Sequence, residues 1–319
     1  MPRRFLFVGV TTGESSIMPI FPRWRNALGL DPRAEIVGRD LPIHAPVEQY
    51  RETVAWLKDD PDNLGALVTT HKIDLFHAAH DLFDEIDSYG RLLTEVSCIA
   101  QRDGRLLGWA KDPISAGRAL REILHPGYFG RTGAEVLCLG AGGAGNAIAL
   151  HLLHASNADD RPGRIVLTDP DSSRLHRLEA LHAECPRNVT VEYFHTGDPV
   201  EVSRLMSELP PSSLIINATG LGKDRPGSPV SDDGQFPLNG IAWDLNYRGE
   251  LRFLQQARKQ EGTRSLRVQD GWKYFIHGWA TVIEEVFQRP ITENELSILE
   301  NEAVFARPAS PTRGMREYP

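Results

Sequence analysis

Residues 136–153, VLCLGAGGAGNAIALHLL, change from one apolar pattern to another around a group of glycines. The run before the glycines is typical of a buried strand, and the run after them has helical spacing, which together predict a strand, a tight turn and a helix. Gly140, Gly142 and Gly145 have the spacing G-x-G-x-x-G. In a nucleotide-binding turn, the first glycine allows the sharp turn, the second lets a pyrophosphate approach the backbone, and the third lets the helix pack closely on the strand.

The start of the predicted helix favours an anion at this turn. Free N–H groups and the positive end of the helix dipole would point at the pyrophosphate. Gly143 and Ala144 lie in the same turn and complete the expected cofactor-binding loop. A glycine-rich turn between a strand and a helix also occurs without a ligand, so the pattern alone leaves both interpretations open.

A second apolar run, RIVLTDPDSSRL at residues 164–175, gives the glycines a context. It predicts a buried strand that ends at Asp169, where an acidic side chain accepts hydrogen bonds from the adenosine ribose and repels a 2′-phosphate. We therefore expect a nicotinamide dinucleotide as cofactor, with NAD preferred over NADP. The alternative role for Asp169 is a helix N-cap, for which Asp171 and Ser172 compete.

Size, charge and cysteine content narrow the class of protein. The chain has 319 residues, enough for two domains, and its formal net charge of −8 argues against nonspecific nucleic-acid binding. No apolar run reaches the length of a membrane span, and the N-terminal MPRRFLFVGV is typical of a first strand rather than a signal peptide. The three cysteines are widely spaced, which indicates a reducing cytoplasm. We expect a small-molecule partner, and a homodimer is left open.

The alternation of strands and helices along the chain predicts an α/β fold with two domains. Residues 1–120 would form an α/β substrate-binding domain, onto which C-terminal helices at 268–305 pack back. Residues 121–267 would form a Rossmann-type, doubly wound parallel sheet. The glycine-rich segment 125–133 is expected to be a passage between the domains, and 306–319 a disordered tail.

The first third of the chain has patterns clear enough to place individual elements. A hairpin is expected to turn at Asp103-Gly104. The other expected elements are strands at 5–10, 35–40 and 64–69 and helices at 21–28, 47–58, 73–81 and 112–124.

The order of these parts resembles the shikimate/quinate dehydrogenase family over residues 5–287. The more specific matches are Lys72 in VTTHK, Asp112 in DPISAG, the Asn217-Ala218-Thr219-Gly220 strand end and the D-x-x-Y of Asp244-Leu245-Asn246-Tyr247. The resemblance implies reversible hydride transfer between NAD(P) and a hydroxylated cyclic carboxylate, namely shikimate, quinate or a less hydroxylated analogue, as in aromatic amino acid biosynthesis.

The resemblance also implies a catalytic pair. In that family a lysine and an aspartate face the nicotinamide, which implies Lys72 as the acid/base and Asp112 as its partner and hydroxyl ligand. Removing hydride from a carbinol carbon requires a base for the hydroxyl proton, and a lysine beside a carboxylate can exchange that proton if burial lowers its pKa. Without the family, an exposed lysine and a helix-capping aspartate are the simpler interpretations. His71 is expected to point away from Lys72 if both lie on a strand end.

Other positions match the family as binding residues. The turn from Asn217 to Gly220 would lie beneath the nicotinamide. The substrate-binding positions implied by the resemblance are Ser15 or Ser16, Ser97, Lys111, Tyr247 and Asp270, with Gln269 as the alternative to Asp270.

The polar pocket residues of the family are largely replaced. Ala66 and Val68 stand in place of an asparagine and a threonine, Met18 in place of a serine, and Ala110 and Lys111 in place of an asparagine–threonine pair. Each lost hydrogen bond is typically worth about 0.5–1.5 kcal/mol. A highly hydroxylated ring should therefore bind less well, and the physiological substrate stays open.

Aromatic residues suggest what replaces the lost polar groups. Trp109, Trp272 and Tyr274, with Lys111 as an extra cation, are hypothesised to form a wall for a less polar or larger acidic substrate. The alternative is that these aromatics belong to the core.

Alternative functions remain open. They are an enzyme of the methylenetetrahydrofolate dehydrogenase type and a non-catalytic protein that senses NAD or a metabolite. No metal is expected, because His151 and His154 lack further ligands at suitable spacing.

Overall fold

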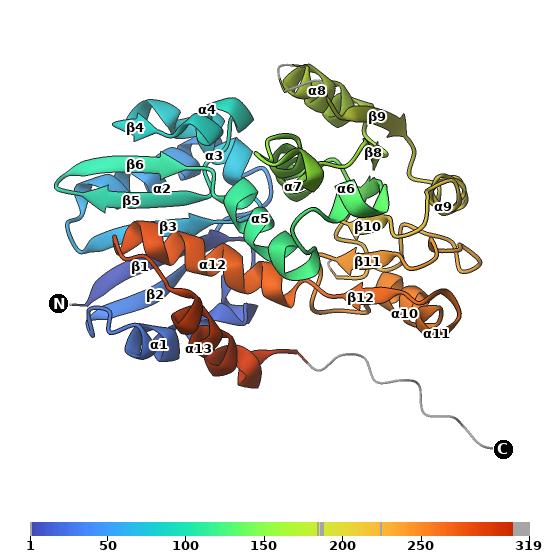
Figure 1. Ribbon diagram of the computed structural model, residues 1–319. Coiled ribbons are helices and arrows are strands. Elements are labelled where there is room, and N and C mark those ends of the chain that lie inside the picture. Colours follow the sequence, from blue (N-terminus) through green and yellow to red (C-terminus); the bar gives the residue numbers. More distant parts are fainter. Residues whose placement is uncertain (1, 184, 186–187, 224, 309–319) are drawn as a thin grey trace. The chain divides into compact units, whose positions relative to one another are not determined.

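The computed structural model describes residues 2–183, 185, 188–223 and 225–308. Within these residues the chain divides into two compact units: unit 1 comprises residues 2–111 and Ile276–Arg307, and unit 2 comprises Asp112–Phe275 and Pro308. Each unit holds one six-stranded sheet (Figure 1). The α/β class with two domains is therefore confirmed. None of the helices in the described residues is long and apolar enough to cross a membrane.

Unit 1 is built on a mixed sheet with the strand order β2-β1-β3-β5-β6-β4. β1 pairs in parallel with β2 and β3, whereas β5 runs antiparallel to β3 and β6, so the expected hairpin at Asp103-Gly104 is present. The bounds in chain order are β1 (Arg3–Gly9), α1 (Ile17–Ala27), β2 (Ala34–Asp40), α2 (Val47–Asp59), β3 (Asn63–Val68), α3 (Lys72–Ala79), β4 (Glu85–Ile86), α4 (Ser88–Leu93), β5 (Cys98–Arg102), β6 (Arg105–Trp109) and α13 (Glu293–Ala303).

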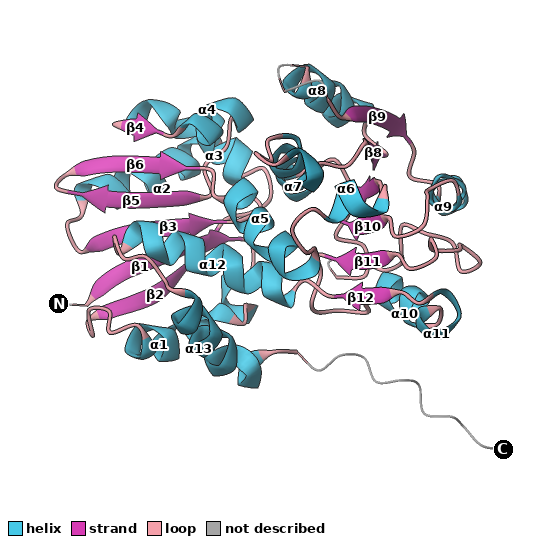
Figure 2. Ribbon diagram, viewed as in Figure 1, coloured by secondary structure: helices cyan, strands magenta, loops and turns pink. Residues whose placement is uncertain are grey.

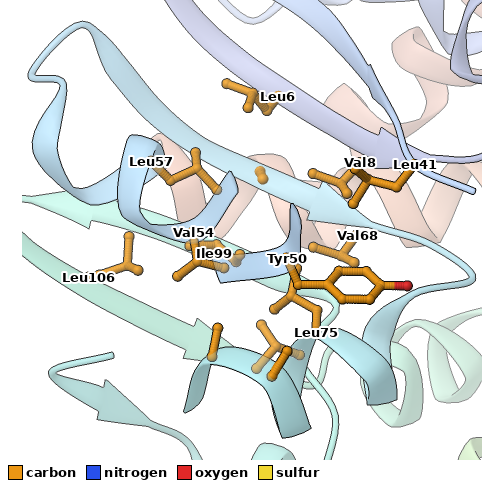
Figure 3. Close-up of a cluster of buried hydrophobic side chains, with 14 of the residues drawn as sticks. Leu6, Val8, Leu41, Tyr50, Val54, Leu57, Val68, Leu75, Ile99 and Leu106 are labelled. Atoms are coloured by element: carbon orange, nitrogen blue, oxygen red, sulfur yellow. The ribbon is translucent and has the colours of Figure 1, made fainter. Parts of the chain in front are cut away.

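The alternation of side chains along β1 explains the two cores of unit 1. Leu6 and Val8 belong to one cluster, with residues of α2 and α3 (Figure 3). Phe5 and Phe7 face the other side of the sheet, where both rings contact Trp279 of α12 (Trp272–Val286). The period of two in a strand thus buries both faces of this sheet.

Unit 2 is built on a parallel sheet with the order β9-β8-β7-β10-β11-β12. Numbered from β7 this is 3-2-1-4-5-6, the order of a doubly wound dinucleotide-binding sheet. Figure 2 shows these strands among the helices of the unit. The bounds are α5 (Asp112–Ile123), α6 (Tyr128–Thr132), β7 (Val136–Leu139), α7 (Gly143–Leu153), β8 (Arg164–Asp169), α8 (Ser172–His182), β9 (Thr190–His195), α9 (Pro199–Ser207), β10 (Leu214–Asn217), β11 (Ile241–Asp244), α10 (Arg252–Arg258), α11 (Glu261–Arg264) and β12 (Arg267–Gln269).

The units divide at different residues from the expected domains. The sequence places the boundaries after residues 120 and 267, whereas the units divide after Lys111 and Phe275. The first difference arises because α5 packs on α7, so closely that a Cβ at Gly117 would overlap the ring of His151.

Several short elements escape the sequence patterns. The expected passage at 125–133 contains α6, and β4, α4 and β12 are too short to show a period. α13 begins with a capping box at Thr292 and Glu295 and lies against α1 (Figure 1). Of the expected disordered tail, residues 309–319 lie outside the described part of the chain.

Candidate functional site

The glycine turn has the geometry that its spacing requires. Gly140 has φ +101°, and a Cβ there would lie 2.8 Å from the carbonyl oxygen of Ala218. A Cβ on Gly145 would overlap the carbonyl oxygen of Gly140, so only glycine lets α7 begin this close to the turn. In the described part of the chain nothing lies within 4 Å of a Cβ built on Gly142, which leaves open space on that side of the backbone. Gly143 and Ala144 form the first turn of α7.

The carboxylate of Asp169 fastens this turn to the end of β8. It accepts hydrogen bonds from the backbone N–H of Ala141 at 2.8 Å and from that of Asp171 at 2.9 Å, and the residue is 3% exposed. The N-cap of α8 is Asp171, which accepts from the N–H of Ser173. The helix-capping alternative therefore applies to Asp171, and Asp169 holds the glycine loop.

A cavity of about 540 Å³ opens at the carboxyl ends of the strands of unit 2. Gly140 follows β7, Asp169 ends β8, and Ala218 follows β10. β7 and β10 are neighbours at the point where the strand order reverses, which is where ligands bind in sheets of this kind. The lining also includes Gly142, Thr219, Leu221, Arg174, Arg225 and Thr196.

Two arginines and a threonine in this lining were not predicted as site residues. The Arg174 guanidinium lies 3.8 Å from Asp169 and 3.6 Å from Asp171. Arg225 donates to the carbonyl oxygen of Thr219 at 3.2 Å. Arg174 belongs to the DPDSSR segment that begins at Asp169, so the sequence could have indicated it as a site residue. No motif marks Arg225 or Thr196.

The strand end Asn217-Ala218-Thr219 is shaped by the side chain of Asn217. Its Oδ1 accepts from the N–H of Thr219 at 3.1 Å and from its hydroxyl at 2.7 Å. Its Nδ2 donates to Oδ1 of Asp244 at 3.0 Å. The loop that lines the cavity, with Gly220 at φ +73°, is thereby tied to the D-x-x-Y segment at the end of β11.

Asp244 is an unusual carboxylic acid. It is wholly buried, and its Oδ1 accepts from Asn217 and from the N–H of Asn246 at 2.9 Å. Within the described residues its Oδ2 has no hydrogen-bond partner. Burial raises the pKa of Asp244 to about 7.

Lys72 and Asp112 each stand at the start of a helix. Lys72 is the first residue of α3 and Asp112 the first residue of α5, and both are half-buried. They belong to different units, unit 1 and unit 2 respectively. β3 ends at Val68, so His71 lies in a turn and not on a strand end.

The N-terminal serines and the replaced pocket residues also lie in unit 1. Ser15 and Ser16 precede α1 and are half-buried, and the side chain of Ser16 makes no capping hydrogen bond to this helix. Ala66 and Val68 are fully buried in the core with Leu6 and Val8, and Met18 lies on α1. The first two therefore offer no polar group to a ligand.

Lys111 is engaged within unit 1 by residues far away in the sequence. Its Nζ lies 2.5 Å from Glu285 of α12, whose other oxygen accepts from Arg102 at 2.7 Å. Ser97 accepts from the N–H of Lys111 at 2.7 Å and donates to the carbonyl of Trp109. Lys111 is thus paired with a carboxylate, and its Nζ also lies 5.4 Å from the centroid of the Trp109 ring; the expected wall around a substrate stays a prediction.

The remaining predicted substrate contacts lie in unit 2. The Tyr247 ring packs against Trp272 and Phe275, with centroids 5.2 and 4.9 Å away. Asp270 accepts from the N–H of Trp272 at the start of α12. The half-buried Tyr274 contacts the buried Trp243, with ring centroids 5.9 Å apart, and its place in a substrate wall stays a prediction.

Known proteins resemble the chain over most of its length. A shikimate dehydrogenase (NADP(+)) from Methanocaldococcus jannaschii is 30% identical over 225 residues, which cover 68% of this chain and 72% of that protein. Another from Symbiobacterium thermophilum is 29% identical over 247 residues, with 76% and 77% covered. No family model matches the chain.

A solved structure agrees with this likeness at the level of the fold. The shikimate 5-dehydrogenase from Thermus thermophilus, in complex with NADP(H) and shikimate, has a TM-score of 0.69 and 22% identity, covering 95% of this chain and 99% of that one. The relative at 30% identity, of which 72% is covered, establishes the kinship. The chain belongs to the shikimate dehydrogenase family.

Proposed function

We propose that this protein is an NAD(P)-dependent dehydrogenase that acts on the CH–OH group of shikimate or a related cyclic hydroxy acid. The observation that carries the proposal is the cavity at the carboxyl ends of β7, β8 and β10, closed on one side by a turn whose glycines leave room for a pyrophosphate. Membership of the family supplies the substrate class, because the relatives are named shikimate dehydrogenases.

The dinucleotide is proposed to bind along this cavity. The pyrophosphate would meet the N-terminus of α7 at Gly142, Gly143 and Ala144, where backbone N–H groups and the helix dipole favour an anion. The turn from Asn217 to Gly220 would support the nicotinamide side. When bound, the nicotinamide accepts or returns the hydride.

The proton of the reaction is assigned to Lys72. As hydride leaves the carbinol carbon, the hydroxyl proton passes to the Lys72 amine, and in the reverse direction the ammonium returns it to the carbonyl oxygen. Asp112 is proposed to hold the amine and the substrate hydroxyl in register. Ser15 or Ser16 would donate to the substrate carboxylate, and Tyr247 would line the site.

We propose NAD as the preferred cofactor, although the relatives are named for NADP(+). The charge at the adenosine end of the cavity supports this preference, because Asp169 and Asp171 are two carboxylates around the single guanidinium of Arg174. A 2′-phosphate would bring about 1.5–2 further negative charges to this place, where Arg174 is already compensated.

The cofactor preference can be tested by freeing Arg174. In Asp171→Ser the hydroxyl still caps α8, while one carboxylate beside the guanidinium is gone. The dissociation constants of NAD⁺ and NADP⁺, measured by titration calorimetry, should show NAD⁺ bound more tightly by the parent and a selective gain for NADP⁺ in the variant. A parent protein that binds NADP⁺ at least as tightly as NAD⁺ would refute the preference.

The activity is tested by following the absorbance of the reduced nicotinamide with a panel of cyclic hydroxy acids. Lys72→Ala should lower kcat/KM by about 10²–10⁴-fold, the usual contribution of a general acid–base group. Lys259→Ala, which removes an exposed lysine in unit 2, is the matched control and should leave turnover unchanged. Tight dinucleotide binding without turnover of any member would instead support a sensor.

The same panel examines the substrate class. Because Ala66 and Val68 offer no hydrogen bonds, we propose that a ring with fewer hydroxyls is accepted at least as well as shikimate or quinate. Preference for shikimate or quinate by orders of magnitude over every less hydroxylated acid would refute this part.

A further inference from the structure

The turn that precedes Lys72 is strained. Thr70 has φ +61°, in the left-handed region, and its side chain is exposed. A β-branched residue in this conformation costs about 1–3 kcal/mol, and such strain persists only where neighbouring contacts impose it. The contacts that hold this turn therefore determine where α3 begins and where its first residue, Lys72, is placed.

His71 is the anchor of the turn. It is 1% exposed, and its Nδ1 lies 3.1 Å from the hydroxyl oxygen of Tyr50 on α2. Tyr50 is itself buried in the core of unit 1, where Figure 3 shows its ring close to Val68 and Leu75, the residues that flank the turn on β3 and α3. The Tyr50 hydroxyl is therefore held rigidly at the place that receives His71.

The proton positions in this cluster follow from its donors and acceptors. A tyrosine hydroxyl donates one hydrogen bond and accepts two. The hydroxyl of Tyr50 accepts from the N–H of Ala45 at 3.2 Å and donates to Oδ2 of Asp74 at 3.4 Å, which leaves one acceptor site. His71 therefore donates from Nδ1–H. Asp74 also meets the exposed His44 at 3.0 Å, which ties the cluster to the loop before α2.

This assignment leaves the other ring nitrogen of His71 unprotonated. Nε2 is buried, and none of the described residues gives it a hydrogen bond. A buried acceptor without a partner costs about 1–3 kcal/mol. The left-handed conformation of Thr70 and the buried Nε2 of His71 thus both lower the stability of the fold at this turn. The next residue, Lys72, is the proposed acid/base.

We propose that Tyr50 and His71 are positioning residues for Lys72: the hydrogen bond from His71 Nδ1 to the Tyr50 hydroxyl imposes the left-handed turn at Thr70 and thereby sets the place of the Lys72 amine. Only the expected effect on kcat/KM rests on the proposed function. The start of α3 at Lys72 lies within unit 1, and the titration of the Lys72 amine can be measured without turnover.

The first test removes the hydroxyl that receives His71. Tyr50→Phe should lower kcat/KM by about 10-fold or more, because small misplacements of a catalytic group have large effects on rate. It should also shift the pH limb of kcat/KM that belongs to the Lys72 amine. Loss of stability alone would lower the rate equally at every pH.

Tyr193→Phe is the matched control. Tyr193 makes the same kind of contact in unit 2, where its hydroxyl lies 2.8 Å from Nδ1 of His182. The control should lose a similar amount of stability and keep the pH limb of the parent. An equal shift of that limb in both variants would overturn the proposal.

A second substitution separates the strain from the bond. Asparagine adopts the left-handed conformation more readily than threonine. In the double variant Tyr50→Phe/Thr70→Asn the turn no longer needs the Tyr50 hydroxyl, so kcat/KM and the pH limb should return toward the parent. If Thr70→Asn changes kcat/KM of the parent and of the Tyr50→Phe variant by the same factor, the turn and the hydroxyl act independently and the proposal is wrong.

The third test does not depend on activity. The chain has six lysines, so the dimethylated Lys72 amine can be assigned by ¹³C NMR with Lys72→Arg as reference. Its titration midpoint should differ between parent and Tyr50→Phe and be the same in parent and Tyr193→Phe. If no candidate substrate turns over but this shift is seen, the proposed function fails and the positioning stands; an unshifted amine refutes the positioning, whatever the activity.

Discussion

The buried carboxyl of Asp244 makes a quantitative prediction about stability. Burial raises its pKa to about 7, and one of its oxygens has no partner among the described residues. In the unfolded chain the pKa of an aspartate is about 4. Between these values the folded protein holds a proton that the unfolded chain has lost, so stability falls as the pH rises through this window.

Asp244→Asn removes the charge and keeps the shape. The amide oxygen can still accept from Asn217 and Asn246, as Oδ1 does now. A pKa difference of about three units corresponds to about 4 kcal/mol at 1.36 kcal/mol per unit. We therefore expect the free energy of unfolding of the variant, relative to that of the parent, to rise by about 1.4 kcal/mol per pH unit from about pH 4 to pH 7. Above that pH the difference should stay constant at no more than about 4 kcal/mol.

The assay is urea unfolding of parent and variant at several pH values across this window. Asp232→Asn is the control, because Asp232 is exposed and its pKa is lowered by Arg252. Stability from a lowered pKa is complete above the unfolded value, so this control should differ from the parent by a constant amount above about pH 5. A difference between Asp244→Asn and the parent that does not change with pH would refute the reasoning.

Two further sets of variants follow from the packing. Gly145→Ala should lose about 1–3 kcal/mol of stability, because the added methyl group overlaps the carbonyl of Gly140. Gly142→Ala should unfold at the same temperature as the parent and bind the dinucleotide more weakly in calorimetry. Equal loss of stability in both would contradict the different roles of the two glycines. Glu285→Gln leaves Lys111 and its neighbouring arginine without a counter-charge and should lower the free energy of urea unfolding by about 1–3 kcal/mol; an unchanged midpoint would show that the pair contributes nothing.

The parts of the fold that could be predicted rest on local patterns. The glycine spacing predicted the turn after β7. Gly140 has a positive φ, which other residues adopt rarely, and at Gly145 a Cβ would overlap the carbonyl oxygen of Gly140. The order of apolar runs also predicted the doubly wound sheet, because parallel strands joined by helices have few ways to pack.

Side-chain partnerships were harder to predict because they join distant residues. No local pattern indicates the ion pair of Lys111, because its partner Glu285 lies 174 positions further along the chain; the expected contact of Lys111 with a substrate stays a prediction. Asp169 was expected at a ribose, and its hydrogen bond to the N–H of Ala141 depends on how two loops meet. The left-handed Thr70 is imposed by its surroundings against the preference of the residue, so no propensity predicts it.

In the proposed reaction, hydride passes directly between the substrate carbinol carbon and the nicotinamide. The most direct measurement uses a cyclic hydroxy acid from the panel carrying deuterium on that carbon, with mass spectrometry of the reduced dinucleotide after turnover. We expect the parent to transfer the deuterium to the nicotinamide ring, and Lys72→Ala to form far less of the labelled product. Reduced dinucleotide without the label, or labelled product formed equally fast by Lys72→Ala, would contradict the mechanism.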